Sequence, residues 1–216
     1  MKNRLSTVFI ALLVAGLADR AEAADLIASV KDTSDKPVAN AVVVVHALAN
    51  KTPLPASAAA VVIDQIDKEF VPMVKPILVG TAVHFPNKDN TRHHVYSFSD
   101  TKTFELQLYT GTPSKPIVFD KPGVAVLGCN IHDWMRGYLY VVDTPYFGKT
   151  DADGKLTIAG LPPGRYTAKV WHYRMKQKEE TTVQTLNVAK AVNVESSWTL
   201  QLRSDFRPPR PHIDSP

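Results

Sequence analysis

One short segment of the 216-residue sequence gathers three side chains that metal ions bind. Cys129, His132 and Met135 follow one another at intervals of three residues, between two apolar runs. A loop of this length can wrap around a single ion and bring a thiol, an imidazole and a thioether to one point. Thiolate and thioether are soft ligands that favour copper, whereas zinc prefers a stronger donor than Met.

A fourth donor has to come from elsewhere in the chain, and the polar segment 87–94 offers one. It ends in His93 and His94, directly before the apolar residues that begin at Val95. One Cys, two His and a weakly bound Met are the ligands of blue-copper electron-transfer sites. Neighbouring side chains on a strand point to opposite faces, so we expect only one of the two histidines at the metal.

Composition excludes several other kinds of site. The chain has a single Cys, which rules out an internal disulfide, four-thiolate zinc, iron–sulfur clusters and copper pairs bridged by two thiolates. The net charge is +4, without a dense block of Lys and Arg, so we expect no nucleic-acid partner. The sequence shows no evident general base, nucleophile or open metal position. We therefore expect a carrier and not an enzyme.

The first residues predict export from the cytoplasm. Lys2 and Arg4 precede an apolar run over 8–18, which is too short for a comfortable membrane span. The run is followed by Ala-Glu-Ala at 21–23, the pattern of a cleavage site. We interpret residues 1–23 as a secretory signal and expect a periplasmic protein. No later run reaches about 18 apolar residues, so we expect no membrane span in the mature chain.

The chain after Ala23 predicts strands and no long helix. Short β-branched and aromatic runs recur, with turn signals between them, at a spacing typical of β-sandwiches. Phe104, Leu106 and Leu108, for example, alternate with polar neighbours as in a half-buried strand. The expected strands cover 26–30, 41–46, 74–79, 83–85, 95–98, 104–108, 117–119, 124–127, 138–142, 156–158, 166–170, 182–188 and 197–202.

Residues 60–143 resemble a cupredoxin of the plastocyanin and amicyanin kind, as found among methylamine-utilization proteins. The order Cys-x-x-His-x-x-Met-Arg-Gly over 129–137 matches the short ligand loop of amicyanin. In a second place, Asn87 lies six residues before His93, as an Asn does before the first His ligand in that family. The resemblance implies one copper ion that alternates between Cu(I) and Cu(II), with Met135 as a long axial ligand.

The same resemblance implies roles for further residues. His93, Cys129 and His132 would be the equatorial ligands, and His94 takes the place of the family's usual Asn. Asn87 would tie the two ligand loops together by hydrogen bonds. Trp134 is a candidate for an apolar patch that docks a redox protein, and a loop anchor packed inward is the alternative. Arg136 is either a surface charge for docking or a donor that stabilises the loop. The resemblance further implies a quinoprotein dehydrogenase and a c-type cytochrome as the redox partners.

The flanking segments 24–49 and 144–202 resemble carboxypeptidase regulatory-like or transthyretin-like sandwiches. The resemblance rests on the turn over 151–155 and on Gly-Leu-Pro-Pro-Gly at 160–164. The expected fold is therefore all-β, with a cupredoxin Greek-key sandwich inserted in or paired with a second small sandwich. One enlarged cupredoxin is the alternative. Residues 203–216 are Pro- and Arg-rich and predict a disordered tail.

Two other functions remain open at this stage. Copper storage or delivery would be favoured by extra Met or His near the site, but the sequence has no Met-rich run. A metal-free structural or binding sandwich would be favoured if Cys129 and His93 lay far apart. The distance between these two side chains therefore separates the hypotheses.

Overall fold

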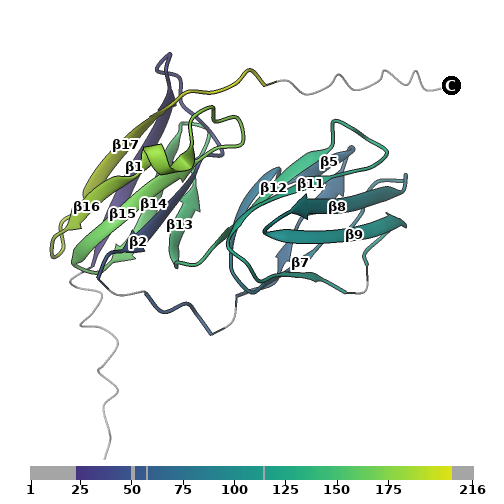
Figure 1. Ribbon diagram of the computed structural model, residues 1–216, viewed down its shortest axis with the longest axis horizontal. Helices are drawn as coiled ribbons and strands as arrows, with labels where there is room; N and C mark the ends of the chain where they lie inside the picture. The colour runs from purple at the N-terminus through teal and green to yellow at the C-terminus, as the bar shows by residue number, and fades with distance from the viewer. Residues whose placement is uncertain (1–22, 50–51, 57, 114, 206–216) are drawn as a thin grey trace, which may run out of the picture.

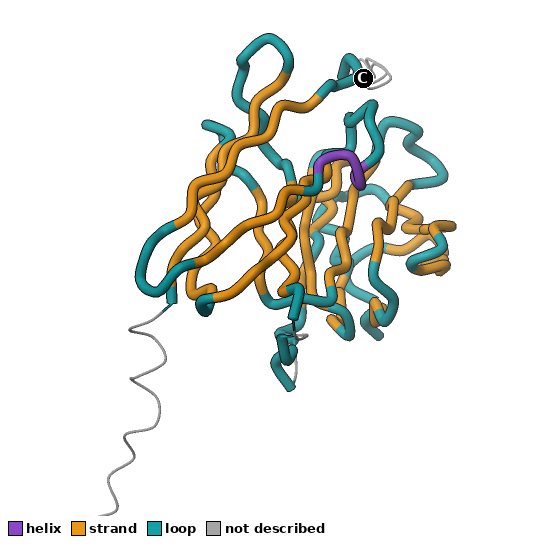
Figure 2. Tube along the Cα trace, turned by 60° about the vertical axis from the view of Figure 1, so that its left-hand side comes forward, coloured by secondary structure: helices purple, strands orange, loops and turns teal. Residues whose placement is uncertain are grey.

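The computed structural model describes residues 23–49, 52–56, 58–113 and 115–205, and its regular structure is almost entirely strand (Figure 2). The described helical structure is a 3₁₀ turn, η2 (Glu179–Thr182). The predicted all-β class is confirmed. No helix in the described part is long and apolar enough to cross a membrane. The predicted signal lies outside the described residues except for Ala23, as does the tail from 206 onward.

Figure 1 shows two lobes side by side. We call the first the metal lobe. Its five-stranded sheet has the order β6-β12-β11-β8-β9 and faces a three-stranded sheet, β10-β7-β3, with a separate ribbon β4-β5. The strands are β3 (Val61–Val62), β4 (Asp64–Ile66), β5 (Glu69–Val71), β6 (Val74–Leu78), β7 (Thr81–His84), β8 (His93–Ser99), β9 (Lys102–Tyr109), β10 (Ile117–Phe119), β11 (Gly123–Gly128) and β12 (Arg136–Val142).

The second lobe, which we call the flanking lobe, is built from both sides of the metal lobe in sequence. Its sheets have the orders β14-β1-β17 and β13-β2-β15-β16. The strands are β1 (Ala24–Asp32), β2 (Val42–Ala47), β13 (Tyr146–Lys149), β14 (Lys155–Leu161), β15 (Gly164–Trp171), β16 (Gln184–Val188) and β17 (Val194–Leu200). Because β2 pairs with β13 directly, the metal lobe enters the chain as an insertion between these two strands.

Two strands with continuous apolar runs hold the lobes together. Along Val42–Val45 of β2, alternate side chains enter the core of the flanking lobe, and the others face the metal lobe. Along 139–142 of β12, alternate side chains likewise enter the core of the metal lobe, and Tyr140 and Val142 pack with Val42 and Val44. A strand buried on both faces lacks polar alternation, which is why both runs are uniformly apolar.

The sequence pattern does not predict four of the short strands. The strands β3, β4, β5 and β13 have two to four residues each, too few to show a period of two. The strand expected over 182–188 begins at Gln184, because Thr182 ends the η2 turn instead. The prediction of a disordered tail over 203–216 also starts at too early a residue. The backbone N–H of Arg203 donates to the Arg174 carbonyl, which ties that residue to the fold.

Candidate metal centre

The side chains that could bind a metal lie at one end of the metal lobe, where β8 begins, β11 ends and β12 begins. His93 is the first residue of β8, and Cys129 directly follows β11. His132 lies on the connection between β11 and β12, which we call the ligand loop (residues 129–135). The last residue of β11, Gly128, pairs with β12 on one side and with β8 on the other. Pairing of these neighbouring strands therefore brings the loop and His93 together.

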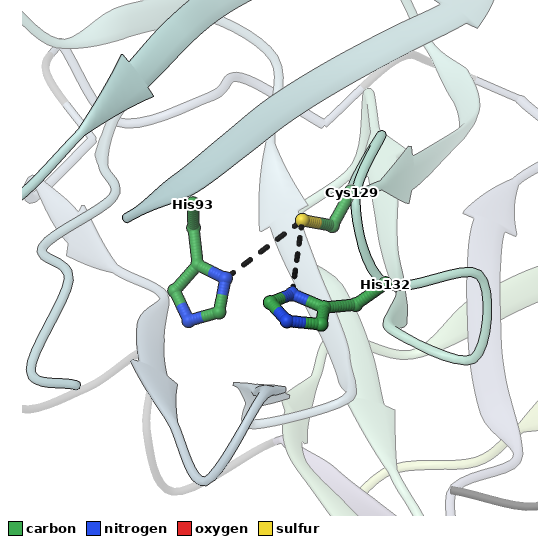
Figure 3. Close-up of side chains that lie close together, drawn as sticks. All are labelled: His93, Cys129 and His132. Carbon is green, nitrogen blue, oxygen red and sulfur yellow. Dashed lines mark hydrogen bonds between the residues drawn. The ribbon is translucent and has the colours of Figure 1, made fainter. Parts of the chain in front are cut away.

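The geometry of the three side chains is that of a preformed donor set (Figure 3). Sγ of Cys129 lies 3.8 Å from Nδ1 of His93 and 3.6 Å from Nδ1 of His132. The three potential ligand atoms all lie within 4.8 Å of one another. Cys129 and His93 are buried, whereas His132 is partly exposed. The sulfur thus faces both imidazoles across a small shared space.

These distances fit one metal ion between the donors. With metal–sulfur and metal–nitrogen bonds of about 2.3 and 2.0 Å, donors 120° apart around an ion lie about 3.7 Å from each other. The observed separations of 3.8 and 3.6 Å bracket that value. A thiolate with two imidazoles is also the trigonal set that copper electron-transfer sites use. The residues present therefore suit a type 1 copper ion.

Met135 lies at the end of the ligand loop and is buried. Its backbone N–H donates to the His132 carbonyl at 2.9 Å, which closes the loop as a tight turn. Its side chain is 1% exposed and packs in the same core cluster as Cys129. The predicted axial ligand therefore lies in the protein interior, in the same core cluster as Cys129.

His93 has a charged partner on the side of the ring away from Cys129. Its Nε2 lies 2.7 Å from Oδ2 of Asp89, and this carboxylate also accepts the backbone N–H groups of Asp67 and Lys68. Burial by itself raises the pKa of Asp89, but the hydrogen bonds from His93 and the two amides hold that pKa below its usual value. An ionised carboxylate in this place fixes the orientation of the imidazole, as in other metal sites.

His132 is the solvent-facing member of the set. Partial burial, together with the neighbouring His93 and Lys68, holds the pKa of His132 below its usual value. The neutral imidazole is the form that binds metal. The ring of His132 packs against that of Trp134, with centroids 5.2 Å apart, and Trp134 is itself partly exposed.

The structure separates His94 from His93. His94 is 7% exposed, and Nε2 lies 2.9 Å from Oε1 of Glu105 without the alignment of a hydrogen bond. Its ring packs against Tyr96 and not against the Cys129 group. Of the two histidines, His93 alone joins the donor set.

Asn87 differs from the implied role. Its side-chain N–H₂ donates to the carbonyls of Thr91 and Tyr109, at 2.8 and 2.9 Å, and its Oδ1 accepts the backbone N–H of Asp89. Both N–H₂ hydrogens are thus used, and among the described residues no Asn87 bond reaches the ligand loop. Asn87 ties the His93 loop to the end of β9 instead of joining the two ligand loops.

Sequence reasoning missed two neighbours of the centre. Asp89 lies four residues before His93, but a single Asp in a polar loop gives no signal of its partner. Tyr96 covers the backbone of Gly128, where a β-carbon would lie 2.6 Å from Cζ of the tyrosine ring. The Gly directly before Cys129 was the available signal, because a strand Gly often marks a close approach. Arg136 is exposed.

No protein-family model matches the sequence, and no curated protein sequence is similar to it. Solved structures are similar over part of the chain. A copper-containing nitrite reductase from Thermus scotoductus SA-01 is 28% identical with a TM-score of 0.36, over 45% of this chain and 25% of that one. The chain thus spans only a quarter of the length of that protein.

Two smaller proteins are similar over most of their own length. A purple cupredoxin from Nitrosopumilus maritimus is 24% identical with a TM-score of 0.34, over 39% of this chain and 100% of that one. A reduced, Cu(I) form of an amicyanin variant is 20% identical with a TM-score of 0.35, over 38% of this chain and 82% of that one.

The metal lobe has a cupredoxin fold. The assignment stands on its own features, which are two facing sheets, a ligand loop between two neighbouring strands and a His₂Cys group where those strands end. The expected class, a cupredoxin sandwich joined to further β-sheets, is therefore confirmed.

Proposed function

We propose that this protein is a type 1 (blue) copper protein that carries single electrons between redox partners. The observation that supports it best is the position of the Cys129 sulfur, which faces Nδ1 of both His93 and His132 at 3.8 and 3.6 Å. Copper bound there supplies a Cu(I)/Cu(II) couple. Met135 is the proposed weak fourth ligand.

In this proposal, the surrounding protein holds the metal ligands in fixed positions. His93 is fully buried and held by Asp89, so its ring is positioned before a metal arrives. A donor set fixed by strand pairing needs little rearrangement when the charge of a bound ion changes by one. Low rearrangement is what a fast electron carrier requires.

His132 is the proposed point where electrons enter and leave. It is the partly exposed ligand, and it lies next to Trp134 and near the exposed side chain of Ile131 in the ligand loop. Apolar and aromatic side chains around an exposed ligand suit a partner that docks and departs. Arg136 adds a charge at the edge of this surface.

The donor count supports a carrier role without catalysis. Three strong donors and a thioether leave no position at the ion for a substrate. We further propose that the protein works in the periplasm, after removal of residues 1–23. A quinoprotein dehydrogenase as electron donor and a c-type cytochrome as acceptor are the partners suggested by the family resemblance.

The test is an absorption spectrum of the protein after addition of Cu(II). We expect an intense visible band from thiolate-to-copper charge transfer, lost in Cys129→Ser and strongly changed in His132→Gln. His84→Gln is the matched control, because His84 lies at the end of β7 outside the donor set, and its band should be unchanged.

Two results would contradict the electron-carrier proposal. Copper that binds without a thiolate band and exchanges readily would favour copper storage or delivery. A failure to bind copper at all would favour a metal-free binding sandwich.

A further inference from the structure

A cavity of about 240 Å³ lies where the two lobes meet, next to the candidate metal centre. The residues of the metal lobe that line it are Glu69, Phe70, Met73, Trp134, Arg136 and Tyr138. The flanking lobe contributes Tyr173 and Arg174 and the segment 203–205. Neither lobe alone would form this cavity. It shares Trp134 and Arg136 with the proposed docking surface, but the proposed electron transfer needs no small molecule bound there.

Aromatic rings form much of the wall. Tyr138 and Tyr173 stack with ring centroids 5.1 Å apart and planes 28° apart. Phe70 and Trp134 also face the cavity. The indole N–H of Trp134 is buried and has no hydrogen-bond partner among the described residues. Flat walls of this kind suit a planar ring, and a ligand acceptor that reached the indole would satisfy that N–H.

The charged residues of the wall favour an anion. Three arginines, Arg136, Arg174 and Arg203, line the cavity together with two carboxylates, Glu69 and Asp205. Arg174 is 3.8 Å from the Asp205 carboxylate and also donates from Nε to the Arg203 carbonyl. No ion pair of the Arg136 or Arg203 guanidinium is found among the described residues. A guanidinium binds a carboxylate by two parallel hydrogen bonds, which a planar acid can accept.

The volume has room for one ring. A cavity of about 150 Å³ is enough to bind benzene. The 240 Å³ here adds room for one small substituent, and it is below the range of sites that hold drug-sized molecules. We propose that this cavity binds a single-ring aromatic carboxylate, with the ring between the aromatic walls and the carboxylate at Arg203 and Arg136.

The location brings such a ligand close to the metal centre. Trp134 forms part of the cavity wall and also packs against His132, at 5.2 Å between ring centroids. A bound ring would therefore lie one side chain away from a candidate copper ligand. The binding itself does not depend on copper, so it can be tested separately from the proposed function.

The experiment is a calorimetric titration of the metal-free full chain with benzoate as probe. We expect saturable binding of one benzoate at millimolar concentrations. Benzamidine has the same ring with a cationic group, and we expect it to bind at least about tenfold more weakly. No saturable binding of benzoate, or equal binding of benzamidine, would overturn the proposal. Repeating the titration in Cys129→Ser keeps the result independent of copper.

A matched pair of variants locates the site. Arg203→Gln removes an exposed guanidinium from the cavity and should weaken benzoate binding about tenfold. Arg165→Gln removes an equally exposed guanidinium from β15, outside the cavity, and should leave the affinity unchanged. Equal affinities in both variants would contradict the assignment of the ligand to this cavity. An unchanged unfolding midpoint confirms that Arg203→Gln is folded.

Discussion

Oδ2 of Asp89 lies 2.7 Å from Nε2 of His93, and the other nitrogen of that ring faces the Cys129 sulfur at 3.8 Å. An ionised carboxylate only accepts hydrogen bonds, so the hydrogen of the imidazole resides on Nε2. Nδ1 is left with its lone pair directed at the thiol. One buried ion-dipole contact thus selects the form of His93 that can bind a metal.

Asp89→Asn tests this relationship. The amide keeps the shape but removes the charge, so we expect copper affinity to fall by about 10- to 100-fold, as for other partners of metal-bound histidines. Competition with a chelator of known affinity measures the change. Asp120→Asn is the control, since Asp120 is exposed and pairs with Lys102. Equal copper affinities of the wild type and Asp89→Asn would show that the charge of Asp89 does not support copper binding.

The donor set could be predicted from the sequence, because its spacing along one loop is itself the signal. Cys129, His132 and Met135 lie within seven residues of one another, so no knowledge of the fold was needed to group them. Strand alternation limited the fourth donor to one of two adjacent histidines. Choosing His93 from the residues alone required the register of β8 against its neighbours, which the sequence does not contain.

The contact between the lobes could not be predicted in the same way. The runs Val42–Val45 and 139–142 were both recognised as strands, but an apolar run does not say what covers its second face. In the structure each run covers the other. Asp89 was missed for a related reason, because its partners Asp67 and Lys68 lie on a turn that no pattern links to the 87–93 loop.

Asn87→Ala should destabilise the metal lobe. The buried Asn87 side chain donates to the carbonyls of Thr91 and Tyr109, and its loss leaves these groups without that donor. We expect the free energy of unfolding to fall by about 1–3 kcal/mol. Denaturant unfolding measures it. Asn187→Ala, at an exposed position of β16, should change it by less than about 0.5 kcal/mol. Equal effects of the two substitutions would contradict a structural role for Asn87.

Gly128→Ala should disturb the environment of the adjacent Cys129. A β-carbon at Gly128 would lie 2.6 Å from Cζ of Tyr96 and 2.7 Å from its hydroxyl oxygen, so the ring has to move. We expect a loss of about 1–3 kcal/mol of unfolding free energy and, in the copper form, a shifted absorption band. Gly164→Ala is the control, because a β-carbon there meets only an ordinary contact at 3.5 Å.

A double-mutant cycle with Tyr96→Ala identifies the cause. If the clash with the tyrosine ring destabilises Gly128→Ala, the same substitution should cost much less in the Tyr96→Ala background. Additive costs would place the strain elsewhere, in the backbone of β11.

His172 should make the protein less stable in mild acid. It is 4% exposed, and its Nδ1 accepts the backbone N–H of Arg174. Burial, and secondarily the charge of Arg174, lowers the pKa of His172 from its ordinary value of 6.5 to about 4. Between these values the unfolded chain binds a proton that the folded chain does not. The free energy of unfolding is therefore not reduced by His172 above about pH 6.5. It decreases as the pH falls toward 4, because the proton binds only to the unfolded chain.

Once the pH is below the folded pKa of His172, this effect has lowered the free energy of unfolding by about 3 kcal/mol. The measurement compares the unfolding free energies of the metal-free protein at pH 7.5 and pH 5 with those of His172→Gln, which retains every other titratable group. We expect the pH-dependent difference to be smaller in the variant, because glutamine stays neutral throughout. An identical pH dependence in the two proteins would mean that the pKa of His172 is the same in the folded and unfolded chains, and hence that burial does not lower it.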